Sequence, residues 1–137
     1  MEAQEIFDKV APHLFTQGCR SSADAADFFA SCLYRGPNGM SCAVGVLIPD
    51  ELYDPEMETI TITNLVNDDE GGWNLPSWMK EKVEFLTSLQ VTHDCPGNWE
   101  STADMQQELR KVAANYKLSP AVLEGLSFAW ETKAEEV

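Results

Sequence analysis

The sequence predicts an α+β fold, a mostly helical single domain with one small β-hairpin around Gly36–Gly39. Apolar residues recur at helical spacing in several long stretches, which predicts helices. The turn Gly36-Pro37-Asn38-Gly39 lies between two short apolar segments, which predicts a hairpin. The 137 residues, 44% of them hydrophobic, suit one compact core and are too few for two ordinary domains. We expect residues 1–137 to form one domain, with 131–137 as a frayed tail.

The first predicted element is a helix from Gln4 to Gln17. Its apolar residues, among them Ile6, Val10 and Leu14, fall on one stripe, and Gly18 is suited to end the helix. After it, residues 25–29 could form a short helix or an irregular approach to the hairpin.

The predicted hairpin pairs residues 32–35 with residues 40–42. Pro37 fixes φ near −65°, and Asn38 and Gly39 tolerate positive φ, so the chain should reverse between them. The apolar run 42–48 that follows could be a buried strand or a buried two-turn helix. We favour the helix, because Ser41 is suited to cap its start and Pro49 to stop it.

Three further helices are predicted in the second half. The first begins at Pro76, runs to about Thr92 and should be the longest in the protein. The next begins at Ser101 and ends near 116, and the last spans 119–130. The last two have the outline of a helix-turn-helix, but the final helix has no basic residue before Lys133, so a plain helical hairpin is favoured.

Acidic residues dominate the charge, with 23 acids against nine bases and a net charge of −14. Such a field disfavours direct binding to nucleic acid or to an anionic membrane and favours a basic protein surface. Between residues 36 and 79 there is no Lys or Arg, and the carboxylates there are our candidate partner-binding residues. They are Asp50, Glu51, Asp54, Glu56, Glu58, Asp68, Asp69 and Glu70. The alternative is that these charges serve solubility alone.

The four cysteines are widely spaced, which fits free thiols in a reducing cytoplasm better than a disulfide framework. The spacing does not favour zinc, calcium or phosphate-loop sites, so we expect neither a metal nor a cofactor. A catalytic pair of Cys42 and His93 is the alternative, because a thiol at a helix N-terminus would have a lowered pKa. The sequence leaves enzymatic activity undecided and leans against it.

Three segments together resemble a group of short uncharacterised proteins of bacteriophages and prophages. They are residues 32–53 (CLYRGPNGMSCAVGVLIPDELY), residues 5–10 (EIFDKV) and residues 89–94 (LQVTHD). The resemblance covers most of the chain and implies no catalytic residue. It implies a protein of the host bacterial cytoplasm, and we expect a small acidic protein-binding module. We expect it to be an inhibitor or anti-defence factor, a DNA mimic in charge, that acts on a host nucleic-acid-handling protein.

Overall fold

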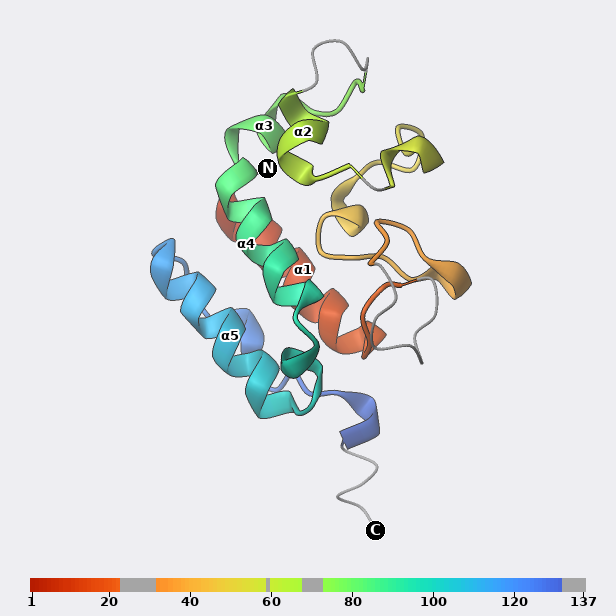
Figure 1. The fold of residues 1–137 in the computed structure, drawn as a ribbon. Helices are drawn as coiled ribbons and strands as arrows, with labels where there is room; N and C mark the ends of the chain where they lie inside the picture. The colour runs from red at the N-terminus through yellow and green to blue at the C-terminus, as the bar shows by residue number, and fades with distance from the viewer. Residues whose placement is uncertain (23–31, 59, 68–72, 132–137) are drawn as a thin grey trace.

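The computed structural model describes residues 1–22, 32–58, 60–67 and 73–131. Within these ranges the protein is helical (Figure 1). Its α-helices are α1 (Ala3–Gln17), α2 (Ile62–Asn67), α3 (Ser77–Glu81), α4 (Val83–Asp94) and α5 (Thr102–Asn115). The described residues contain two isolated β-bridges and no sheet, so the predicted α+β class is wrong and the fold is α-helical.

The predicted hairpin is replaced by a simple chain reversal. Asn38 and Gly39 do have positive φ, 60° and 77°. Arg35 and Ser41 form an isolated antiparallel β-bridge. Next to that bridge the Cys42 N–H donates to the Tyr34 carbonyl at 3.2 Å. A hairpin would add the reciprocal bond, from the Tyr34 N–H to the Cys42 carbonyl. That bond is not made, because the Tyr34 N–H donates to the Glu58 carboxylate and the Cys42 carbonyl accepts the Val46 N–H. Without it the pairing cannot propagate into strands.

The segment 42–48 forms a single helical turn, the 3₁₀ helix η2 (Gly45–Leu47), in place of the favoured two-turn helix. The Cys42 thiol accepts the Gly45 N–H at 3.2 Å, and the Gln90 side chain accepts the Val44 N–H at 3.2 Å. These two acceptors, rather than Ser41, satisfy the N–H groups that begin the turn.

The predicted first helix is confirmed. The buried stripe of α1 contains Ile6, Val10 and Leu14, and the helix ends at Gly18, whose φ is 75°. The N–H of Gly18 donates to the carbonyl of Leu14 at 3.0 Å, as expected of a left-handed C-cap. The short helix considered for 25–29 lies outside the described residues.

The helix predicted from Pro76 is interrupted at Lys82, whose backbone (φ −104°, ψ 18°) separates α3 from α4. The longest described helix is therefore α1, with 15 residues against 12 in α4. The helix after Ser101 is confirmed as α5, and the Ser101 hydroxyl caps it by accepting the Asp104 N–H at 3.0 Å.

The helix predicted over 119–130 does not form. This segment holds the 3₁₀ turn η5 (Ala121–Leu123), after which Gly125 adopts a φ of 79°, and helical conformation resumes only at Ala129. The Gln106 side-chain amide of α5 donates to the carbonyls of Leu123 (2.7 Å) and Leu126 (3.0 Å). Of the predicted tail 131–137, only Glu131 is described, and its carboxylate accepts the Thr102 N–H.

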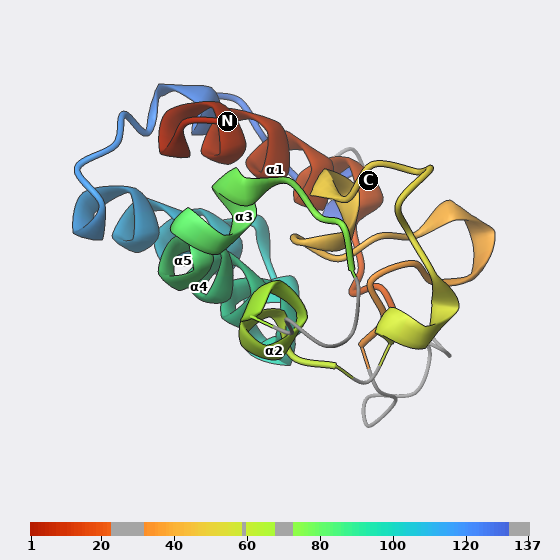
Figure 2. The ribbon, with the colours of Figure 1, turned by 90° about the horizontal axis from the view of Figure 1, so that it is seen from above.

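The core lies between α1, α4 and α5, with the C-terminal segment running beside α1 (Figure 2). Helix α4 packs against both α2 and α5, and α1 contacts η2 and η5. The irregular segment 32–58 lies on one side of the helices and contacts α1 through η2 (Figure 1). None of the helices in the described ranges has the length and apolar character required to cross a membrane.

Candidate functional site

A pocket of about 300 Å³ lies where the segment 32–58 meets α2 and α4. Helix α4 contributes one wall, the start of α2 a second, and the chain around the reversal a third. The lining residues are Cys32, Tyr34, Cys42, Glu58, Ile60, Thr61, Ile62, Thr87, Gln90, Val91 and Asp94. Because three distant parts of the chain meet here, the pocket depends on the tertiary fold.

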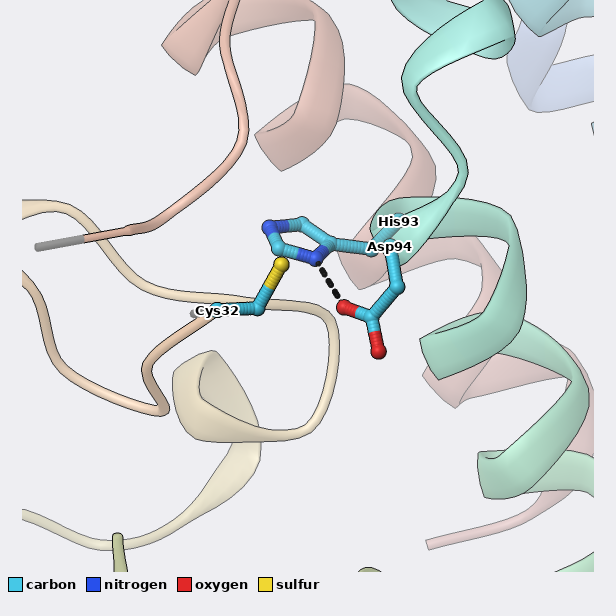
Figure 3. Close-up of side chains that lie close together, drawn as sticks. All are labelled: Cys32, His93 and Asp94. Atoms are coloured by element: carbon cyan, nitrogen blue, oxygen red, sulfur yellow. Dashed lines mark hydrogen bonds and ion pairs between the residues drawn. The ribbon is translucent and has the colours of Figure 1, made fainter. Parts of the chain in front are cut away.

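At one end of this pocket the side chains of Cys32, His93 and Asp94 converge (Figure 3), and their potential ligand atoms all lie within 4.8 Å of one another. The imidazole of His93 is fully buried. Its Nδ1 lies 2.8 Å from Asp94 Oδ1, and its Nε2 lies 2.9 Å from the Ser21 backbone nitrogen. The Ser21 N–H can only donate, so Nε2 is the acceptor and Nδ1 carries a proton when the ring is neutral.

This hydrogen bonding does not suit a metal site. A neutral imidazole has one lone pair, and here the Ser21 N–H occupies it. If a metal bound Nδ1, the neutral imidazole would carry its proton on Nε2, and that proton would point at the Ser21 N–H, a second donor. Three potential ligand atoms in proximity therefore do not make this cluster a metal centre.

The same hydrogen bonding prevents His93 from acting as a base for Cys32, whose thiol has the Asp94 carboxylate as its side-chain hydrogen-bond partner. His93 has no free lone pair with which to accept the thiol proton. Burial, with Asp94 as the next cause, raises the pKa of the Cys32 thiol to about 11, although Arg20 opposes the shift. A thiol that stays protonated at neutral pH is a weak nucleophile.

Cys42 and His93, the alternative catalytic pair, are both buried. The thiol that clusters with His93 and Asp94 in the described structure is that of Cys32, and Cys42 is not part of this cluster. Burial raises the pKa of Cys42 to about 12, and its sulfur accepts the Gly45 N–H. Cys42 therefore has a structural role at the start of η2. All four cysteines are free thiols in the structure.

The carboxylates predicted to bind a partner differ in their surroundings. Asp50 is 90% exposed and pairs with Arg35 at 2.8 Å. Asp54 accepts the Glu56 N–H at 2.9 Å and so caps η3 (Pro55–Met57). Glu51 and Glu56 are exposed, and their carboxylates have no hydrogen-bond or ion-pair partner among the described residues.

Glu58 is half-buried and has an internal structural role. Its carboxylate accepts the N–H groups of Tyr34 (2.8 Å) and Arg35 (3.1 Å) and the hydroxyl of Tyr53 (2.6 Å). The remaining predicted residues, Asp68, Asp69 and Glu70, lie outside the described part of the chain. Of the predicted carboxylates that the structure describes, Asp50, Glu51 and Glu56 are exposed and Asp54 is half-buried. These four residues are called the acidic surface below.

Of the described residues that line the pocket, sequence reasoning named only Cys42 and Glu58 as candidates, and Cys32, Gln90 and Asp94 are among those that it missed. The adjacency of His93 and Asp94 in the chain was the only local signal. No sequence pattern indicated that Cys32 would join them, because it arrives from a segment 61 positions earlier. No protein-family model matches the chain, and no curated protein or solved structure is significantly similar to it.

Proposed function

We propose that this protein is a non-catalytic protein-binding module whose acidic surface binds a basic protein. The observation that carries the proposal is the state of Glu51 and Glu56, two exposed carboxylates with no cation beside them in the described structure. Fixed negative charge of this kind accelerates encounter with a positively charged surface.

The chemistry at the pocket favours binding over catalysis. Both thiols that line it have raised pKa values, about 11 for Cys32 and about 12 for Cys42. The neighbouring imidazole has both nitrogens committed to hydrogen bonds. Nucleophilic catalysis needs an activated thiolate with a base in reach, and these residues supply neither.

The partner we infer is a host protein that handles nucleic acid, because such proteins present basic surfaces that an acidic module can occupy. The resemblance of residues 32–53 to phage and prophage proteins supports a role as an inhibitor or anti-defence factor. A net charge of −14 is compatible with imitation of the charge of DNA.

The test uses Glu51→Gln/Glu56→Gln, which removes the unpaired charges. Asp50, Asp54 and Glu58 stay unchanged because each has an internal partner. The tagged full chain captures proteins from a bacterial host lysate, mass spectrometry identifies them, and association rates are then measured with the purified candidate. We expect the variant to associate at least about threefold more slowly, with the difference disappearing at high salt.

The matched control is Glu81→Gln/Glu84→Gln, which makes the same change in net charge at exposed positions of α3 and α4. Only the first variant should slow association. Equal rates for the wild type and both variants would refute binding through the acidic surface, and equal slowing by both would indicate net charge alone.

A further inference from the structure

The pocket beside α4 combines apolar walls with an acidic end. Ile60, Ile62 and Val91 contribute apolar surface, and Val91 is 62% exposed. An exposed β-branched side chain at the edge of a pocket offers a contact surface that the described chain does not itself cover. A volume of about 300 Å³ suits one long side chain better than a large cofactor.

The charges in the pocket are all negative. Asp94 and Glu58 line it, and none of the described residues that line it is a Lys or Arg. The guanidinium of Arg35 is directed to Asp50 and to the carbonyls of Gly45 and Ile48. Arg20 contacts the sulfur of Cys32 at 3.6 Å and does not line the pocket.

Asp94 is held in position with one oxygen still available. The side-chain nitrogens of Gln90 and His93 both contact Oδ1, each at 2.8 Å. In Figure 3 the second carboxylate oxygen points away from the imidazole, and no nitrogen of the described residues contacts it. The Asp94 side chain is 44% exposed. The Cys32 thiol is a further hydrogen-bond partner of this carboxylate. A carboxylate oriented by such donors and still partly exposed is a preorganised acceptor for a cation.

We propose that this pocket receives an arginine side chain of the protein partner. The three methylenes would lie against Ile60 and Val91, and the guanidinium would donate to the free oxygen of Asp94. Arginine fits better than lysine because its guanidinium is less strongly hydrated and matches carboxylate geometry. The inference deepens the proposed function and rests on it for the identity of the ligand as part of a protein.

The test titrates the ¹⁵N-labelled full chain with N-acetyl-arginine-N-methylamide and follows amide shifts by NMR. N-acetyl-citrulline-N-methylamide, an uncharged isostere, and the corresponding lysine compound are the controls. We expect saturable shifts centred on Thr61, Gln90, Val91 and Asp94 with the arginine compound. Citrulline should bind at least about tenfold more weakly, because it lacks the charge.

Two variants test the assigned contacts. Asp94→Asn keeps an oxygen that can accept from His93 and Gln90 but removes the charge, and should weaken arginine binding about tenfold. Val91→Ser, at an exposed position, should weaken it about threefold and carries the test if Asp94→Asn fails to fold. Unsaturable shifts, equal binding of citrulline, tighter binding of lysine or full affinity in both variants would overturn the proposal.

The acidic-surface variant Glu51→Gln/Glu56→Gln separates this proposal from the proposed function. It should leave arginine binding in the pocket unchanged, since neither residue lines the pocket. If the arginine compound binds but that variant associates normally with the captured partner, the acidic surface is refuted and the pocket stands. If the variant slows association but no arginine binding is seen, the pocket is refuted and the acidic surface stands.

Discussion

Gly45, after the chain reversal, packs directly against the backbone of Tyr34, before it. A Cβ atom built on Gly45 would lie 1.9 Å from the carbonyl oxygen of Tyr34 and 2.6 Å from its carbonyl carbon. These are backbone atoms, so no side-chain rotation could relieve the contact. The approach positions Tyr34 and Cys42 on the same wall of the pocket.

We therefore expect Gly45→Ala to lower the free energy of unfolding by about 3 kcal/mol or more, because the backbone must move to admit the methyl group. Urea denaturation would measure the change. Gly97→Ala is the matched control, since its nearest contact would be the Cys95 sulfur at 4.0 Å. Similar, small effects of the two substitutions would show that the Tyr34 backbone does not lie against Gly45.

The buried thiol of Cys42 predicts a loss of stability in alkali. Burial raises its pKa from the ordinary value of 9.0 to about 12. Between these values the unfolded chain loses the thiol proton and the folded chain keeps it, so stability is full below pH 9 and falls as the pH rises. The expected contribution is about 1.4 kcal/mol per pH unit.

Denaturation curves from pH 8 to pH 10.5 would measure this slope. Cys42→Ala should make it shallower, whereas Cys95→Ala, at an exposed position, should leave it unchanged. The same slope in wild type and Cys42→Ala would mean that the thiol is not buried.

Among the elements, those with local signals were predicted well. The stripe and terminal glycine of α1 and the cap of α5 are encoded within each helix, so both helices were found with nearly correct ends. The segment 119–130 has helical periodicity but is bound by a side chain from another element. The Gln106 side-chain amide donates to the carbonyls of Leu123 and Leu126, and sequence periodicity cannot reveal such a tertiary contact.

Gln106→Met should release this segment. The Leu126 carbonyl would lose this donor, and the Leu123 carbonyl would keep only the Leu126 N–H. The loss should cost about 1–2 kcal/mol and speed amide hydrogen exchange in residues 121–128. Mass spectrometry after deuterium labelling would detect the change. Gln107→Met, at the neighbouring exposed position, is the control and should leave exchange in 121–128 as in the wild type.

At the scale of the whole molecule, sequence reasoning predicted the turn residues and much of the acidic surface but not the pocket. The turn was predictable because Asn38 and Gly39 tolerate positive φ in any context. The role of Glu58 was not, because its donors belong to residues 34, 35 and 53 and the pairing exists only in the folded chain. The same holds for Cys32 beside His93 and Asp94.

The net charge of −14 leads to a prediction for the molecule as a whole. Self-repulsion among unpaired carboxylates opposes the compact state, and added salt screens it. Between 10 mM and 0.15 M NaCl the Debye length shrinks from about 30 Å to about 8 Å. We expect the free energy of unfolding to rise by an amount on the order of 1 kcal/mol, or the melting temperature by about 2–4 °C, over this range.

The variant Glu51→Lys/Glu56→Lys makes the net charge four units less negative. Its stability should rise less with the same salt, because less repulsion remains to be screened. A melting temperature that does not change with salt in the wild type would mean that the carboxylates are locally compensated, which would also remove the basis for steering a basic partner.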